Sequence, residues 1–177
     1  MIRRLLSAAL LAVAVLPAAA APAPPEPSAE LLARARAILE RAPLIDAHND
    51  LPSMLIEKGD EAWKAIDLGA VQPQLCADIP RLRAGRVGAQ YWSIFTASEN
   101  AHTRTSLHEA VREIDVVLEM IRRYPELELA RTADDIERIH RAGRIASLMG
   151  IEGGHMIEDA LGVLRVFHLL GARYMTL

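Results

Sequence analysis

Short apolar runs alternate with longer amphipathic segments along this chain, and each run ends in polar or glycine-rich residues. The runs cover residues 44–50, 87–95, 144–154 and 172–177, and the first of them is expected to be a buried strand. Such alternation is typical of right-handed βαβ units, whose strands form a parallel sheet. We therefore expect an α/β fold, specifically a (β/α)8 barrel of the TIM type with its site at the carboxyl ends of the strands. Four strands supply about half of such a barrel.

Helices are expected between these runs. Their apolar positions recur at helical spacing over residues 29–41, 106–124, 132–143 and 157–170. Ser106 and Glu109 have the spacing of a capping box, and Thr132 and Asp135 are expected to open the next helix. Gly171 ends the last helix before the final strand.

The first residues differ in composition from the rest of the chain. Arg3 and Arg4 precede an apolar run from Leu5 to Leu16, and small residues follow it. This layout is typical of a secretory signal peptide over residues 1–20, with cleavage before Ala21 and export to the periplasm or beyond. The alternative is an uncleaved anchor, but the run is shorter than the roughly 20 residues that span a membrane. Residues 21–28 resemble an extended Pro-rich spacer.

Charge and cysteine content exclude some classes of partner and bond. The net charge is −3 and no basic segment stands out, so nucleic acid is not an expected partner. Cys76 is the single cysteine, which rules out an intrachain disulfide. We expect it to be a small, partly buried residue, since nothing near it in the sequence completes a metal site.

The segment "IDAHNDLP" places His48 and Asp50 two residues apart at the end of the first strand. Positions i and i+2 of a strand point to the same side, so both side chains should face the mouth of the barrel. An imidazole nitrogen and a carboxylate oxygen are good ligands for zinc and similar ions. Asn49 should face the other way and brace the backbone. The motif alone also fits the polar end of an ordinary strand.

The segment "GIEGGH" places a second carboxylate, Glu152, directly after an apolar strand. An ionised carboxylate is costly there unless it is paired or bound to a metal, although a solvated loop glutamate is the alternative. Gly153 and Gly154 leave room for backbone or substrate. Because His48, Asp50 and Glu152 all follow strands of one barrel, we expect them to form a metal site.

Four segments, "IDAHNDLP", "DIPRLRAGRVGAQYWS", "ASLMGIEGGH" and "LGVLRVFHLLGARYMTL", resemble the membrane (renal-type) dipeptidase family of zinc peptidases in order and spacing. The resemblance covers residues 44–177 and implies a (β/α) barrel with two zinc ions. It implies that His48 and Asp50 bind the first ion and that Glu152 bridges both. It also implies that a metal-bridged hydroxide attacks the scissile bond of a dipeptide, so that Glu152 acts in catalysis through this water.

Other polar and aromatic residues are interpreted as structural or surface residues. His155 could line the pocket, but a structural role beneath the loop is preferred. Trp92 and Phe95 are expected in the core. Four histidines fall away from the strand ends and are expected on the surface or in packing: His102, His108, His140 and His168. The sequence is compatible with a homodimer.

Two rival functions are compatible with a barrel of this type. Another barrel amidohydrolase would act on cyclic amides, bases or β-lactams, but such enzymes usually present H-x-H at the first strand, and Asp50 argues against them. A metal-free binding protein or inactive remnant is the second rival. Metal analysis of the purified protein separates it from the enzymes.

The family's second-zinc histidines, acid/base aspartate and carboxylate-binding arginine have no counterpart among residues 1–177, so we interpret residues 29–177 as the N-terminal part of a truncated barrel. Residues 21–177 expressed alone should therefore lack dipeptidase activity and expose apolar surface. A dipeptide panel with added zinc, together with size-exclusion chromatography, checks both expectations. Efficient zinc-dependent hydrolysis by a well-folded monomer would contradict them.

Overall fold

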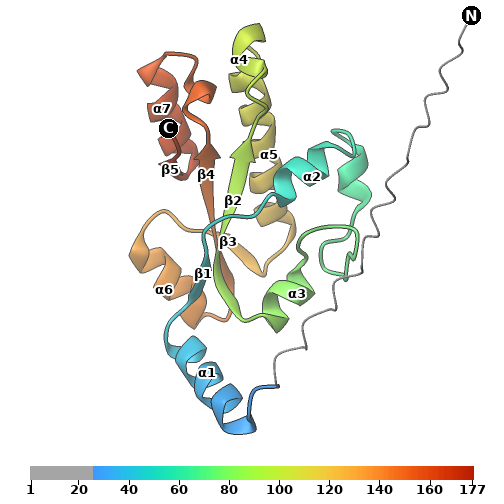
Figure 1. The fold of residues 1–177 in the computed structure, drawn as a ribbon, viewed down its shortest axis with the longest axis vertical. Coiled ribbons are helices and arrows are strands. Elements are labelled where there is room, and N and C mark those ends of the chain that lie inside the picture. Colours follow the sequence, from blue (N-terminus) through green and yellow to red (C-terminus); the bar gives the residue numbers. More distant parts are fainter. Residues whose placement is uncertain (1–25) are drawn as a thin grey trace, which may run out of the picture.

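Residues 26–177, the part of the chain that the computed structural model describes, build a parallel sheet of five strands with helices around it (Figure 1). The predicted signal peptide and most of the predicted spacer lie outside these residues. The strands are β1 Leu44–Asp46, β2 Val87–Phe95, β3 Leu127–Leu129, β4 Ile145–Glu152 and β5 Ala172–Met175. The helices are α1 Ala29–Arg41, α2 Leu51–Ile56, η1 Ala62–Ala65, α3 Ile79–Ala84, α4 Asn100–Thr103, α5 Ser106–Arg123, α6 Ala133–Arg141, η2 Gly154–Ile157 and α7 Leu161–Leu170.

The two long strands β2 and β4 form the centre of the sheet. Their pairing is continuous from Ala89 opposite Ala146 to Phe95 opposite Glu152. β1 lies on the outer edge of β2, while β3 and β5 share the other edge of β4. β3 accompanies the beginning of β4 and β5 its end, so the strand order is β1-β2-β4-β3 near the beginning of β4 and β1-β2-β4-β5 near its end, with every pair parallel. This is the parallel arrangement expected from the sequence.

One face of the sheet is covered by α5, α2 and their neighbours. Trp92 and Ile94 of β2 and Ile151 of β4 belong to a core that also contains buried residues of α5 and α2, among them Ile114 and Leu55. Side chains of a strand alternate between its two faces, so these positions identify the helix-covered side. Burial of such large side chains contributes about 1.5–3 kcal/mol each and fixes α5 against the sheet.

The opposite face of the sheet carries apolar residues near the beginning of the strands and polar residues near their carboxyl ends. Near the beginning of the strands, Ile139 of α6 packs with Ala89, Ala146 and Leu148. Farther along the same face, alternation brings Ser93 of β2 and Glu152 of β4 to the carboxyl edge. The described residues contain no helix long and apolar enough to cross a membrane.

The first strand is shorter and more exposed than the sequence indicated. Residues 44–50 were expected as a buried strand, but β1 ends at Asp46, and Leu44 and Ile45 are 41% and 46% exposed. The reason is position: β1 has a neighbour on one side only, so its apolar residues lie at an edge of the sheet. Phe95 was also expected in the core and is 42% exposed, because it lies at the carboxyl end of β2; Trp92, at 1%, confirms the prediction.

The helix predictions are confirmed in outline and corrected in detail. α1 and α6 lie where predicted, whereas α7 begins at Leu161 after the short η2 turn. β3 was not predicted, because three residues give too short an alternation to recognise. The capping box at Ser106 is wrong: Thr105 is the N-cap residue of α5, and the Ser106 hydroxyl is buried without a hydrogen-bond partner. Thr132 and Asp135 open α6 as expected, and the structure shows that they form a complete capping box.

These two serine/threonine positions give a matched pair of substitutions. Thr132→Ala removes the hydroxyl that accepts the Asp135 amide hydrogen at 3.1 Å, and it should lower the free energy of unfolding by about 1 kcal/mol. Ser106→Ala removes no cap and should leave the stability unchanged or slightly higher. Urea denaturation of both variants measures the difference, and equal losses would show that the cap on α6 contributes nothing specific.

Candidate metal centre

The turn after β1 is held by the backbone of the neighbouring strand. The carbonyl of Asn49 accepts a hydrogen bond from the Ser93 amide at 2.9 Å, which extends the β1–β2 pairing beyond β1 itself. The next residue, Asp50, is the N-cap of α2 but makes no side-chain cap. Leu51 and Leu55, which are 1% and 0% exposed, anchor the short helix that follows. The backbone at Asp50 is therefore held in place, and its carboxylate makes no hydrogen bond that caps its own helix.

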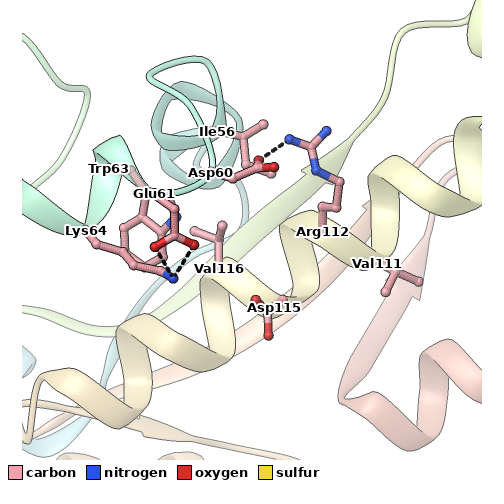
Figure 2. Close-up of a pocket in the computed structure, with 9 residues that line it drawn as sticks. All are labelled: Ile56, Asp60, Glu61, Trp63, Lys64, Val111, Arg112, Asp115 and Val116. Atoms are coloured by element: carbon pink, nitrogen blue, oxygen red, sulfur yellow. Dashed lines mark hydrogen bonds and ion pairs between the residues drawn. The ribbon is translucent and has the colours of Figure 1, made fainter.

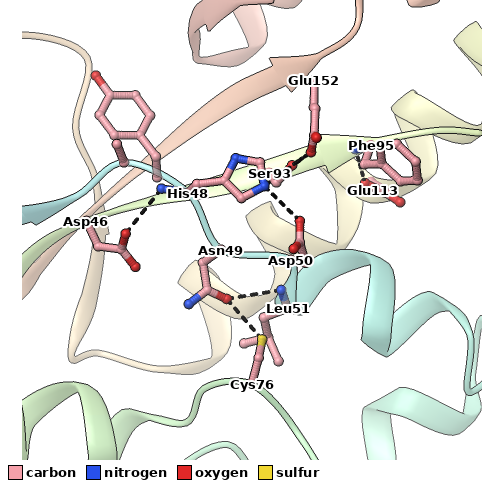
Figure 3. A network of polar contacts seen from close by, with 12 residues as sticks. Asp46, His48, Asn49, Asp50, Leu51, Cys76, Ser93, Phe95, Glu113 and Glu152 are labelled. Carbon is pink, nitrogen blue, oxygen red and sulfur yellow. Dashed lines mark hydrogen bonds and ion pairs between the residues drawn. The ribbon is translucent and has the colours of Figure 1, made fainter.

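The side chain of Asn49 points away from the two flanking residues, as expected from alternation (Figure 3). Its Oδ1 accepts from the Leu51 amide at 3.1 Å and from the Cys76 thiol at 3.2 Å, and its Nδ2 donates to buried Gln90 at 3.4 Å. Cys76 is exposed rather than partly buried. Burial of the thiol group itself, followed by the charge of Asp50, raises the pKa of Cys76. Asn49 thus braces the turn from behind.

Glu152 is the last residue of β4 and precedes a turn that requires glycine. Gly153 has φ +134°, and a Cβ there would lie 2.5 Å from the ring of His155. The Glu152 carboxylate accepts a hydrogen bond from the buried Ser93 hydroxyl at 2.8 Å. A serine in the middle of an apolar strand was a visible signal, but the sequence did not indicate what it contacts.

The structure brings His48, Asp50 and Glu152 together at the carboxyl edge of the sheet (Figure 3). Nε2 of His48 lies 3.1 Å from Oδ1 of Asp50 and 3.2 Å from Oε2 of Glu152. One ligand atom of each residue lies within 4.8 Å of the others, and this is the one group of three or more such residues within residues 26–177. The side chains are 45%, 56% and 37% exposed, so solvent and small molecules reach them.

The chemistry of these donors fits a divalent metal ion. Among residues 26–177, no ion pair joins Asp50 or Glu152 to an arginine or lysine, so two carboxylates share one imidazole without a permanent cation. A divalent ion between them would supply the missing positive charge. One nitrogen and two carboxylate oxygens are ligands that zinc accepts, and three protein ligands leave positions open for water or substrate.

His155 does not join this group. Its Nε2 lies 3.0 Å from the hydroxyl and 3.1 Å from the carbonyl oxygen of Thr96, which is buried just after β2. The histidine therefore connects the turn after β4 to the end of β2, beneath the loop.

Glu113 of α5 is a buried carboxyl that sequence reasoning missed. It is 5% exposed and accepts a hydrogen bond from the Phe95 amide at 2.7 Å, at the end of β2 (Figure 3). Burial raises the pKa of Glu113 to about 7, while the Phe95 hydrogen bond opposes this shift. The sequence of α5 did not indicate that Glu113 is buried. The spacing of a single glutamate beside the apolar face of a helix does not distinguish a buried side chain from one that faces solvent.

A separate pocket lies between η1 and α5, away from the strand ends (Figure 2). Four of its five charged groups form pairs: Arg112 contacts Asp60, and Lys64 donates to Glu61 at 2.8 Å. The hydrogen bond to Glu61 raises the pKa of Lys64. Mutual pairing satisfies these groups within the protein, so the pocket presents less ligand-binding chemistry than the carboxyl edge.

Comparison with solved structures identifies the fold. The chain is similar to the probable dipeptidase PvdM from Pseudomonas aeruginosa, with a TM-score of 0.65 and 19% identity over 82% of this chain and 37% of that one. It is also similar to a metallo peptidase from Rhodobacter sphaeroides liganded with a phosphinate mimic of the dipeptide L-Ala-D-Ala, with a TM-score of 0.60 and 22% identity over 76% and 45%. The fold is therefore that of part of a TIM-type α/β barrel.

Sequence comparison identifies the family. Residues 32–177 match the model of "Membrane dipeptidase (Peptidase family M19)", and the chain belongs to this family. It is 37% identical to human Dipeptidase 3 over 84% of this chain and 29% of that protein. It is 40% identical to Dipeptidase ataJ of Aspergillus terreus over 82% and 37%. The chain thus spans about a third of the length of these relatives.

The raised pKa of Glu113 predicts a pH-dependent stability. The folded state holds its proton up to about pH 7, whereas an ordinary glutamate loses it near 4.5, so stability should fall as the pH rises between these values. The loss should reach about 3 kcal/mol by pH 8. Glu113→Gln keeps an oxygen for the Phe95 amide but cannot ionise, so it should gain stability over the unmodified protein as the pH rises.

Urea denaturation of both forms from pH 5 to pH 8, with a chelator present, measures this difference. The gap between the two proteins should be small at pH 5 and largest at pH 8. Parallel pH profiles would show that Glu113 ionises in the folded state as an ordinary surface glutamate does.

Proposed function

We propose that this chain is part of a zinc-dependent dipeptidase in which His48, Asp50 and Glu152 bind metal. The observation that carries the proposal is the convergence of these three donors at the carboxyl edge of the sheet, within a chain of the membrane dipeptidase family. The structural relative from Rhodobacter sphaeroides, with its dipeptide mimic, supports dipeptides as the substrate class.

Each proposed ligand has a distinct place in the centre. His48 and Asp50 hold the first ion, because they follow β1 together and share one side of the turn. Glu152, which lies opposite them at the end of β4, would help to hold both the first ion and a second. When bound, the two ions polarise the scissile carbonyl and acidify a water molecule. Among residues 26–177 there is no second group of three donors for another complete site.

The surrounding residues of this chain control how the ligands are presented. Ser93 occupies one oxygen of Glu152 with a hydrogen bond, which limits rotation of the carboxylate. Asn49 holds the turn between His48 and Asp50 from behind. Such outer contacts orient ligands before the ion arrives and reduce the cost of binding it. We further propose that the predicted signal peptide is removed on export and that the mature protein acts in the periplasm or outside the cell.

Replacing one ligand should abolish metal binding and activity together. In the protein that carries this chain, Asp50→Ala should reduce the bound zinc and lower kcat/KM for dipeptides by at least about 100-fold, since ligand loss removes the charge that holds the ion. Asp115→Asn is the matched control: this aspartate is exposed on α5, away from the centre, and should leave both quantities unchanged (Figure 2).

Zinc content by atomic emission and a dipeptide assay measure the two effects. Circular dichroism should show both variants folded, because Asp50 makes no cap bond to α2. Full zinc content and normal turnover in Asp50→Ala would exclude Asp50 as a ligand. Absence of bound metal from the unmodified protein would instead favour a non-catalytic relative of the family.

A further inference from the structure

Tyr174 of β5 reaches across the sheet to the turn that carries His48. Its hydroxyl donates to the carbonyl of Ala47 at 3.1 Å, although the two residues are 127 positions apart in the sequence. The strand order places β4 and β2 between β5 and β1. In a flat sheet three strand spacings amount to roughly 14 Å, which exceeds the length of a tyrosine side chain. The contact therefore exists because the sheet curls toward a barrel.

The Tyr174 side chain has room to extend over β4 because residue 150 is glycine. Gly150 lies opposite Tyr174 in the β4–β5 pairing. A Cβ at Gly150 would lie 2.0 Å from Cζ and 2.4 Å from the hydroxyl oxygen of Tyr174, which is too close for any real contact. The ring of Tyr91 lies on the same side, with its centroid 5.2 Å from that of Tyr174. Gly150 and Tyr91 together fix the direction of the Tyr174 ring.

This hydrogen bond completes the support of one peptide unit. The peptide between Ala47 and His48 presents a carbonyl and an amide; the amide of His48 donates to the Asp46 carboxylate at 3.3 Å, and the carbonyl accepts from Tyr174. Burial, followed by the charge of Glu152, raises the pKa of Tyr174, which keeps the hydroxyl protonated and able to donate. Both polar groups of the peptide that carries His48 are thus held by side chains.

We infer that Tyr174 is a positioning residue for the metal centre: through the Ala47 carbonyl it holds the turn that presents the His48 imidazole. This inference rests on the proposed metal site and adds to it a contact from the opposite strand of the sheet. Residues that orient a ligand from behind typically change metal affinity by about 10- to 100-fold when they are replaced. Tyr174 contacts neither the ion nor the substrate in this role.

Two tyrosines of the same region provide the test and its control. Tyr174→Phe removes only the hydroxyl and keeps the ring over Gly150, so zinc affinity should fall by about tenfold with little change in thermal stability. Tyr91→Phe removes a hydroxyl that makes no hydrogen bond within residues 26–177, and zinc affinity should stay the same. Gly150→Ala forces the Tyr174 ring aside and should weaken zinc binding at least as much as Tyr174→Phe.

Zinc affinity is measured on the protein that carries this chain, by competition with a chromophoric chelator. Amide hydrogen exchange of peptides covering residues 44–50 is the second readout: it should become faster in Tyr174→Phe and remain unchanged in Tyr91→Phe, whereas a general loss of stability would accelerate exchange throughout the sheet.

The outcomes separate this inference from the proposed function. If the unmodified protein binds no zinc, the proposed function fails, and unchanged exchange at residues 44–50 in Tyr174→Phe would overturn the positioning role as well. If the unmodified protein binds zinc and Tyr174→Phe binds it equally tightly, the inference alone is overturned. An equal loss in Tyr91→Phe would also overturn it, because the effect would then not depend on the hydroxyl that holds Ala47.

Discussion

The seven-residue pairing between β2 and β4 is the interaction on which the rest of the structure depends. It sets the register that places Phe95 opposite Glu152, and so fixes the position of Glu152 relative to the end of β2. Ser93, two residues earlier in β2, then lies on the same face and reaches the Glu152 carboxylate. A slip of one residue would turn Ser93 toward the helices and remove this contact. The position of the carboxylate is therefore a consequence of strand register.

The carboxyl edge of the sheet is distinguished by carboxylates that have no arginine or lysine partner within residues 26–177. Two carboxylates approach one imidazole, and neither is neutralised by an arginine or lysine of residues 26–177. Elsewhere in these residues, exposed acids such as Glu61 and Asp60 do have such partners. The difference means that the edge keeps negative charge available for a cation, while most charged groups of the pocket beside η1 pair with one another.

The supporting residues come from every side of the centre. Asn49 braces the turn after β1 from below, Ser93 holds Glu152 from β2, and Tyr174 crosses from β5 to the peptide of His48. Glu113 of α5 secures the end of β2 from the helix-covered face. A site supported from several strands and a helix keeps its geometry only while the sheet stays curled. Local changes in this curl therefore act on the proposed metal ligands.

Several features could be predicted from the sequence because their causes are local. The spacing of His48 and Asp50, the glycine turn after Glu152 and the start of α6 at Thr132 each depend on residues close together in the chain. Hydrophobic periodicity likewise predicted α1 and the two central strands. Because parallel strands end at one edge of a sheet, the grouping of His48, Asp50 and Glu152 was also within reach of the sequence.

Other features were decided only by the tertiary structure. Whether Leu44 and Phe95 are buried depends on which strands and helices cover them, and both proved exposed. Glu113 is buried because α5 packs onto the end of β2, and no pattern within the helix records that contact. The bond from Tyr174 to Ala47 requires a curled sheet and a missing Cβ at Gly150 at the same time. The sequence by itself determined which groups could bind a metal; the curvature and register of the sheet decided how they are held, because these distances are set by packing between segments far apart in the chain.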